Sequence, residues 1–198
     1  MLDTGEGLPD MRATRRVLGA LAAGATLAAT LSPGQAWAAG GALRRGVQAL
    51  PDFTFTDGEG APRRIADFAG QGLLVNFWAT WCPPCVAEMP ALDRLQAMLK
   101  SEGFTVLALS SDRGGRAQVA PFYERVELRH LGIWLDPRGA AGRLLGVRGL
   151  PTSIIVDRQG REVARLEGAA AWDAPDMVAA IRDLIGPAGP QRSETDRT

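Results

Sequence analysis

The sequence predicts an α/β domain in which helices cover both faces of a central sheet. Two stretches, residues 73–78 and 104–110, are almost continuously apolar, as expected for strands that are buried on both sides. Between them, apolar residues recur at three- and four-residue spacing over 89–99, which indicates a helix with one buried face. Strand and helix continue to alternate after residue 110, which favours a sheet rich in parallel pairs.

Residues 1–41 have the pattern of a targeting segment. Arginines precede an Ala-, Leu- and Gly-rich run at 17–31, and Ala36-Trp37-Ala38 offers a small-residue cleavage site. Thr14-Arg15-Arg16-Val17-Leu18 resembles a twin-arginine signal, so twin-arginine export and general secretion both stay open. We expect a periplasmic protein that is cleaved near Ala38, with an uncleaved inner-membrane anchor at 17–31 as the alternative.

The remaining chain is expected to form one domain over residues 42–187, followed by a disordered tail at 188–198. The first expected element is a strand extension at Pro51–Thr56, where apolar and polar residues alternate as in an edge strand. Asp57–Gly60 is its turn. The chain carries 22 basic and 22 acidic residues, so no basic surplus points to nucleic acid.

Both cysteines of the protein lie where the strand at 73–78 ends and the helix begins. The first turn of a helix has unpaired N–H groups and partial positive charge, and both favour a thiolate over a thiol. Cys82 is therefore the expected nucleophile. Cys85, one turn further on, is the expected resolving thiol, because it can attack a mixed disulfide at Cys82 and release the substrate reduced.

The residues around the cysteines are expected to tune the site and to contact the substrate. Pro83 and Pro84 suit a helix start, stiffen the loop and remove two N–H donors, so we expect a moderately lowered pKa for Cys82 and a reducing couple. Trp81 is expected to shield the thiolate and to offer an apolar platform to the partner.

The cysteine pair fits a structural staple or a metal site less well than a reactive pair. A disulfide that closes so short a loop constrains the unfolded chain little, so it would be a poor staple. A structural zinc site needs about four Cys or His ligands. The chain offers two cysteines and His130, which is expected at the surface or at a helix end, so no metal site is predicted.

The later elements follow from the same patterns of apolar residues, turn residues and helix breakers. A helix is expected to end at Gly186-Pro187 and to begin with a cap at Asp173. The expected elements before it are a strand at Phe104–Ser110, a helix at Arg116–Leu128 interrupted or started by Pro121, a short strand or extended run at Leu131–Leu135, a short helix at Gly139–Leu145, and a hairpin of Ile154–Val156 with Arg161–Leu166.

The cysteine segment also carries a family resemblance. Trp81-Cys82-Pro83-Pro84-Cys85 behind a Val-Asn-Phe-Trp-Ala strand resembles the active site of the thioredoxin superfamily. Glu88-Met89-Pro90 and the later Gly149-Leu150-Pro151-Thr152 are similar to the TlpA/ResA branch of periplasmic thiol:disulfide oxidoreductases. The resemblance implies a thioredoxin fold, with a central mixed sheet flanked by helices, over roughly residues 50–186.

The resemblance also implies roles for three further residues. Glu88 takes the proton-shuttle role that Asn76 cannot fill, provided that partial burial raises its pKa; otherwise it is a solvated surface carboxylate. The Leu150–Pro151 bond is implied to be cis, with Pro151 packed against the sulfurs. The backbone of Leu150 would then be free to pair with an extended substrate segment.

The family's partners are implied in the same way. Its members reduce protein disulfides, including those of apocytochromes c and of the copper-site proteins of respiratory oxidases, and a membrane thiol donor of the DsbD/CcdA type recharges them. Asp112–Gly115 and Glu167–Asp173 look more like TlpA, which favours maturation of the oxidase copper site. We expect a monomer that needs no cofactor beyond the redox-active Cys82–Cys85 disulfide.

Two alternative functions share this fold. A Cu(I) metallochaperone of the Sco type uses a wider cysteine spacing and a suitably placed His, which this chain lacks. A peroxidase of the peroxiredoxin type needs a Thr three residues before its reactive Cys, whereas Thr80 lies two residues before Cys82. Reduction of protein disulfides is therefore the preferred prediction.

Overall fold

The computed structural model describes residues 43–187. The predicted export segment at 1–41 and the predicted tail at 188–198 lie outside these residues, so both stay predictions. None of the helices within 43–187 combines the length and the apolar character that crossing a bilayer requires.

Within residues 43–187 the chain forms one mixed sheet of eight strands in the order β1-β8-β7-β4-β5-β6-β2-β3. Strands β4, β5 and β6 run parallel, and all other neighbours are antiparallel. The mixed sheet predicted from the sequence is thus confirmed. Its strands are β1 (Arg44–Ala49), β2 (Thr54–Asp57), β3 (Pro62–Arg64), β4 (Gly72–Trp78), β5 (Phe104–Ser110), β6 (Trp134–Leu135), β7 (Thr152–Val156) and β8 (Arg161–Glu167).

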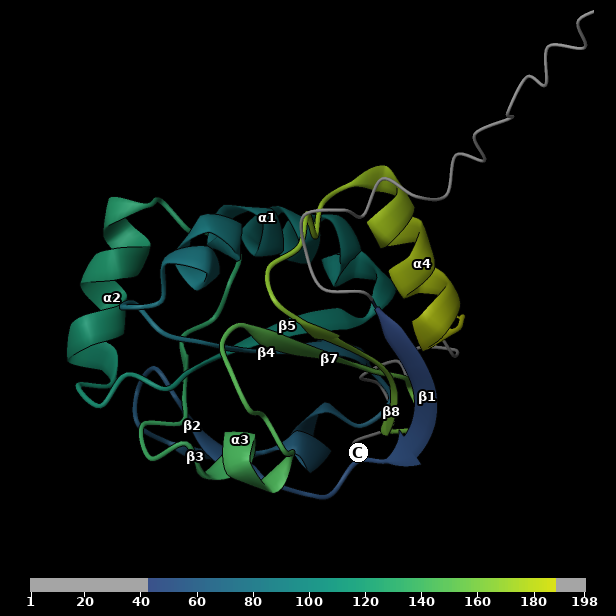
Figure 1. Ribbon diagram of the computed structural model, residues 1–198, viewed down its shortest axis with the longest axis horizontal. Helices are drawn as coiled ribbons and strands as arrows, with labels where there is room; N and C mark the ends of the chain where they lie inside the picture. The colour runs from purple at the N-terminus through teal and green to yellow at the C-terminus, as the bar shows by residue number, and fades with distance from the viewer. Residues whose placement is uncertain (1–42, 188–198) are drawn as a thin grey trace, which may run out of the picture. The chain divides into compact units, whose positions relative to one another are not determined.

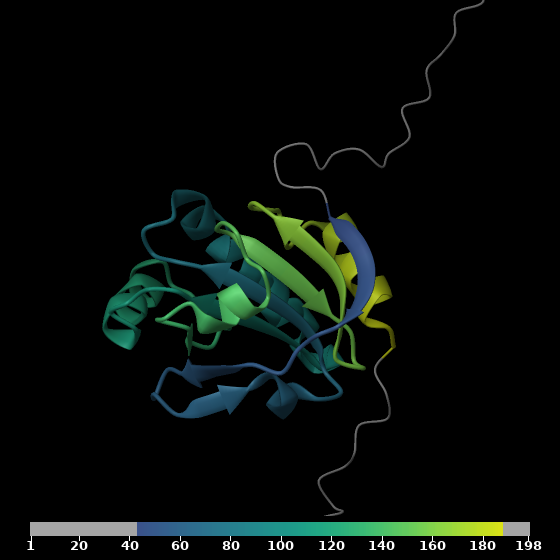
Figure 2. The same cartoon turned by 60° about the horizontal axis from the view of Figure 1, so that its bottom comes forward.

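Helices cover both faces of this sheet. Figures 1 and 2 show α1 and α4 on one face and α3 on the other. Apolar residues of α2 join the same core cluster as those of α1 and α4, so these three helices share a face. The helices are α1 (Pro83–Leu99), α2 (Arg116–Arg125), α3 (Ala140–Leu144) and α4 (Pro175–Ile185), with short 3-10 turns η1 (Ile65–Phe68) and η2 (Lys100–Glu102).

The central strand β4 carries the core on both of its faces, because every one of its residues is buried. Leu74 and Trp78 join the cluster under α1, whereas Val75 and Phe77 join the cluster on the α3 side. Side chains alternate along a strand, so Asn76 faces the α1 side together with Leu74 and Trp78. This register puts a polar amide under the cysteine-bearing helix.

The predicted strand extension exists but is not an edge strand. β2 lies between β6 and β3, so the edges of the sheet are β3 and β1. The sequence prediction also missed β1, whose six residues are all exposed and show no apolar alternation. Its pairing with β8 makes it a strand.

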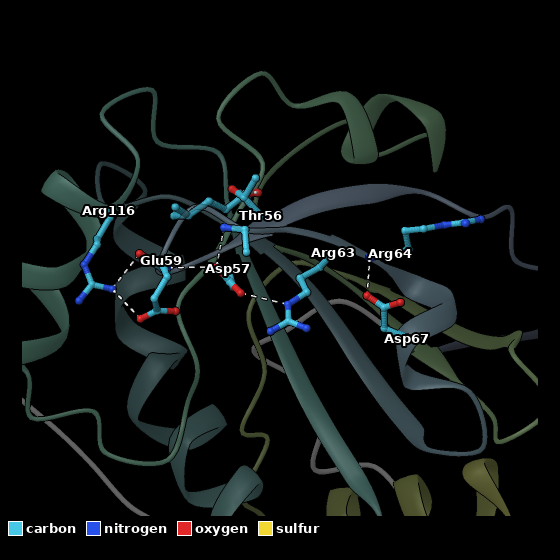
Figure 3. A network of polar contacts seen from close by, with 10 residues as sticks. Thr56, Asp57, Glu59, Arg63, Arg64, Asp67 and Arg116 are labelled. Carbon is cyan, nitrogen blue, oxygen red and sulfur yellow. Dashed lines mark hydrogen bonds and ion pairs between the residues drawn. The ribbon is translucent and has the colours of Figure 1, made fainter.

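A polar network fastens the β2–β3 hairpin to α2 (Figure 3). The buried Asp57 carboxylate accepts the N–H of Ala61 at 2.8 Å and of Glu59 at 3.1 Å, and the side chain of Arg63 at 3.0 Å. The bond from Ala61, in particular, lowers the pKa of Asp57. Arg116 of α2 donates to Gly58 O at 2.8 Å and to Glu59 at 3.3 Å, which closes the network.

Several predicted helix details were wrong at the level of single residues. Pro121 lies inside α2, and that helix ends at Arg125 rather than Leu128. The residue that precedes α4 is Ala174 and not Asp173, whose carboxylate pairs with Arg94 at 2.7 Å. Met98 of α1 is 42% exposed, whereas the other apolar residues of the predicted stripe, Met89, Leu92, Leu95 and Leu99, are fully buried.

Candidate active site

The two cysteines form a disulfide at the N-terminus of α1, with an Sγ–Sγ distance of 2.09 Å. Cys82 is the capping residue that precedes the helix, and Cys85 lies in the first turn. Pro83 and Pro84 occupy the first two helical positions, where a missing N–H interrupts no helical hydrogen bond. The helix is 17 residues long, so its partial positive charge points at Cys82.

Cys82 lies at the floor of a groove with a cavity volume of about 610 Å³. Only 5% of Cys82 is exposed, which is a small fraction for a reactive cysteine, and Cys85 is fully buried. Trp81 beside it is 66% exposed. Of the two cysteines, a partner can therefore reach Cys82, which lines this groove. The other residues that line it are Phe77, Pro83, Pro84, Ser111, Gly139, Gly142, Arg143, Val147, Arg148, Gly149 and Leu150.

The loop before β7 forms one wall of the groove. The Leu150–Pro151 bond is cis, as the sequence resemblance implied. Pro151 is buried and its carbonyl accepts the N–H of Gly168 at 2.9 Å. Within residues 43–187, no hydrogen bond uses the N–H or C=O of Leu150, so this backbone is open toward the groove.

Glu88 is a buried carboxylate, 3% exposed, on the turn of α1 that follows Cys85. The alternative of a solvated surface carboxylate is therefore wrong. Its Oε1 accepts the Asn76 amide at 2.8 Å. Its Oε2 accepts the indole N–H of Trp172 at 2.8 Å and the backbone N–H of Ala170 at 3.0 Å. Residues three apart on a helix lie on the same side, so Glu88 and Cys85 are neighbours.

Burial raises the pKa of Glu88 from 4.5 to about 7, against the three hydrogen bonds, which lower it. All three donors belong to neutral groups, and none is a cation. The loss of solvent therefore outweighs the stabilisation of the anion. A carboxyl with this pKa exchanges protons near neutral pH, whereas an ordinary Glu is fully ionised there.

Asn76 of β4 donates a hydrogen bond to Glu88, and its own amide oxygen has no hydrogen-bond partner within residues 43–187. Its Nδ2 donates to Glu88 at 2.8 Å and to Ser153 Oγ at 3.0 Å, whereas its buried Oδ1 has no partner within residues 43–187. A protonated Glu88 must donate its proton to an acceptor. A half-turn of the Asn76 amide would supply one, because it exchanges Nδ2 and Oδ1.

Asp112 is the site residue that sequence reasoning missed. It follows β5 and is fully buried. Its carboxylate accepts the N–H and hydroxyl of Thr80 at 2.9 and 2.7 Å, the Ser110 hydroxyl at 2.8 Å and the Gln118 amide at 2.7 Å. Asp112 thus anchors the loop that carries Trp81 and Cys82. Only the Asp112–Gly115 similarity to the family could have drawn attention to it.

We expect Asp112→Ala to destabilise the folded protein by about 2 kcal/mol, because the buried Ser110 hydroxyl and the half-buried Thr80 lose their acceptor, whereas the exposed Gln118 amide can turn to water. Urea unfolding monitored by circular dichroism measures this loss. Asp183→Ala is the matched control: the Asp183 side chain is exposed and makes no hydrogen bond within residues 43–187, so a change under about 0.5 kcal/mol is expected. Equal stability of the two variants would show that Asp112 anchors nothing.

His130 lies at the surface, as predicted, and its backbone N–H donates to Asp93 at 2.7 Å. In the described part of the chain no three His, Cys, Asp or Glu side chains gather so that they could hold a metal ion. The chemistry at this site that the structure supports is that of the two sulfurs and the neighbouring carboxyl.

The fold and the site together define a thiol–disulfide exchange protein: a thioredoxin-like sheet, a disulfide at a helix N-terminus, and a cis proline at the start of β7, next to the groove residue Leu150. The model of the Redoxin family matches residues 45–181. The chain therefore belongs to the Redoxin family, and it is a thiol:disulfide oxidoreductase with a thioredoxin fold, as predicted.

Named relatives agree with this assignment. The chain is 36% identical over 118 residues to the thiol-disulfide oxidoreductase ResA of Bacillus thuringiensis, covering 60% of this chain and 67% of that protein. It is 31% identical over 144 residues to ResA of Halalkalibacterium halodurans, covering 73% and 78%. Among solved structures, a protein of Chlorobium tepidum described as thiol:disulfide interchange protein DsbE superposes with a TM-score of 0.64 at 30% identity, covering 73% of this chain and all of that one.

Proposed function

We propose that the protein is exported and reduces disulfides in other exported proteins by exchange at Cys82. The observation that carries this proposal is the pairing of Cys82, on an open groove, with the buried Cys85 and the neighbouring Glu88. The targeting pattern in residues 1–41 supports export. An anchor at residues 17–31 stays part of the proposal as the alternative to a cleaved signal.

The proposed reaction begins with the reduced protein. The Cys82 thiolate attacks one sulfur of the partner's disulfide, forming a mixed disulfide and releasing the partner's other sulfur as a thiolate, which takes up a proton. Glu88 then accepts the proton of the Cys85 thiol. The resulting thiolate attacks Cys82 Sγ, which restores the Cys82–Cys85 disulfide and releases the second partner sulfur. Two electrons pass to the partner, which becomes a dithiol.

Reduction is the proposed direction because the site stabilises its thiolate only in part. Pro83 and Pro84 remove two N–H donors from the helix start, so the positive end of α1 acts on Cys82 with fewer hydrogen bonds. A less stabilised thiolate makes the disulfide less oxidising. Trp81 is proposed to shield the sulfur, and Leu150 to pair with an extended partner segment, while Pro151 itself adds no N–H donor near the sulfur.

The proposed partners come from the family resemblance. They are apocytochromes c or, as the similarity of Asp112–Gly115 and Glu167–Asp173 to TlpA favours, the copper-site proteins of a respiratory oxidase. Each catalytic cycle leaves the protein oxidised, so it needs a thiol donor. A membrane protein of the DsbD/CcdA type is proposed for this step, and the oxidoreductase is proposed to act as a monomer without a further cofactor.

Trapping in the cell tests this function. A Cys85→Ser variant keeps its nucleophile but cannot resolve mixed disulfides, so its partners accumulate as covalent complexes that mass spectrometry identifies. Exported proteins with paired cysteines are expected. Copper titration and a peroxide assay on the purified protein test the two alternatives. Absence of mixed disulfides, together with tight Cu(I) binding or rapid peroxide reduction, would replace the proposed function.

A further inference from the structure

The charged residues that line the groove at Cys82 are all basic. Its lining contains two charged residues, Arg143 and Arg148, and no carboxylate. Both arginines are exposed. The chain as a whole is balanced, with 22 basic and 22 acidic residues, so the basic character belongs to this surface and not to the composition.

Neither arginine is neutralised by an acidic side chain within residues 43–187. Arg148 makes no ion pair or side-chain hydrogen bond there, and Arg143 donates only to the carbonyl of Arg138, at 2.6 Å. Arg94 and Arg182, by contrast, are paired with carboxylates. The two groove arginines therefore keep their full charge for an incoming molecule.

The carboxylates closest in sequence to this wall are already occupied. Asp136 is buried and accepts the N–H of Ala140 at 2.8 Å and of Gly142 at 3.2 Å, at the start of α3. Asp112 accepts its four donors on the loop that carries the cysteines. Both carboxylates are fixed inside the fold, so neither can turn outward to screen the groove.

The remaining walls indicate the form of the occupant. Trp81, Val147 and Leu150 supply apolar surface, and the unused backbone of Leu150 fits the edge of an extended chain. An extended segment that lies along this backbone brings the residues that flank its cysteine past α3 and the loop that follows it. Arg143 lies on α3, and Arg148 lies on the loop that follows it.

We propose that the groove selects an acidic polypeptide segment: an extended stretch in which Asp or Glu flanks the disulfide-bonded cysteine. This inference rests on the proposed function and adds the class of partner. Charges at the rim of an interface act chiefly on the association rate and on the choice of partner, and salt screens their effect. The preference should therefore appear in the second-order rate constant and weaken at high salt.

Three synthetic peptides test the proposal. Each has ten residues, with a central cysteine held as a mixed disulfide with 2-mercaptoethanol, which is neutral, and the three differ only in carrying Asp, Asn or Lys on both sides of that cysteine. Reduced protein is mixed with each peptide, and release of the peptide thiol is followed by chromatography after an acid quench. We expect the Asp peptide to react about tenfold faster than the Lys peptide in low salt, with Asn between them.

Substitutions assign the preference to the two arginines. In an Arg143→Gln, Arg148→Gln double variant the Asp-to-Lys rate ratio should fall to nearly one, and so should the ratio for the unchanged protein in 1 M salt. Arg45→Gln is the matched control, because Arg45 is exposed on β1 outside the groove, and it should keep the tenfold ratio. Equal rates for all three peptides would overturn the acidic preference alone. Failure to reduce any peptide would overturn the proposed function and the preference with it.

Discussion

Replacing Cys82 by serine is expected to lower the rate of insulin reduction by dithiothreitol to the rate measured without protein. A hydroxyl in place of Sγ cannot exchange bonds with a disulfide, and Cys85 is fully buried and cannot take over. The turbidity that follows reduction of the insulin interchain disulfides gives the rate. The expected loss is complete within the error of the uncatalysed reaction.

The control for this loss is the other cysteine. Cys85→Ser keeps the groove and the nucleophile, so it should still form a mixed disulfide with insulin in a single turnover and then stall. Non-reducing electrophoresis detects that complex. If Cys82→Ser formed the complex and Cys85→Ser did not, the two roles would have to be exchanged, and the groove would no longer explain access.

Glu88→Gln is expected to have the second large effect, on the pH dependence of stability. The carboxyl has a pKa of about 7 in the folded protein and an ordinary value near 4.5 when unfolded. Its contribution to stability is therefore complete below pH 4.5 and is lost as the pH rises to about 7, because the unfolded chain ionises first. The difference between the two values corresponds to about 3 kcal/mol.

Glutamine removes this titration while keeping the shape of the side chain. Its carbonyl can accept the N–H groups of Trp172 and Ala170, and its amide can donate to Asn76 Oδ1 once that amide turns. The oxidised protein suits the measurement, since its cysteines do not titrate. Urea unfolding at several pH values should show Glu88→Gln gaining up to about 3 kcal/mol relative to the unchanged protein between pH 4.5 and 7. Parallel stability curves would mean that Glu88 titrates normally.

The same variant tests the proposed proton transfer. An ionised Glu88 accepts the Cys85 proton, so the resolving step of the unchanged protein should speed up as the pH rises through about 7. In Glu88→Gln the resolving step should be about a hundredfold slower at pH 7. The pH at which its rate increases should then shift to the pKa of the Cys85 thiol. Rapid mixing of reduced protein with a peptide disulfide measures this step. An unchanged profile would restrict Glu88 to a structural role.

The sequence was sufficient for the centre of the fold because its signals there are local. Continuous apolar runs identified β4 and β5, since a strand covered on both faces needs apolar residues on both. The strand β1 carries no such signal, because its pairing with β8 is made between distant segments. Met98 was wrongly predicted to be buried, because apolar spacing along the helix does not show which residues contact a distant strand. Gln96 takes a buried position on α1 instead, where it bonds the backbone of β5 through Phe104 and Val106.

The same distinction applies to the site. Cys82, Cys85 and Pro151 lie in short segments whose residue types suggest their roles directly. The surroundings of Glu88 could not be inferred from its helix, because Asn76 comes from β4 and Trp172 from the loop after β8. Only the folded chain brings these groups together.

Alkylation of the reduced protein tests most directly whether Cys82 is the working sulfur. Iodoacetamide is added at a series of pH values, and the modified cysteine is identified by mass spectrometry of tryptic peptides. Cys82 should react alone, with a pH dependence that indicates a pKa below the value of about 8.5 of a free thiol, and Cys85 should stay unmodified. A Cys82 that resists the reagent at neutral pH, or a Cys85 that reacts first, would contradict exchange at Cys82.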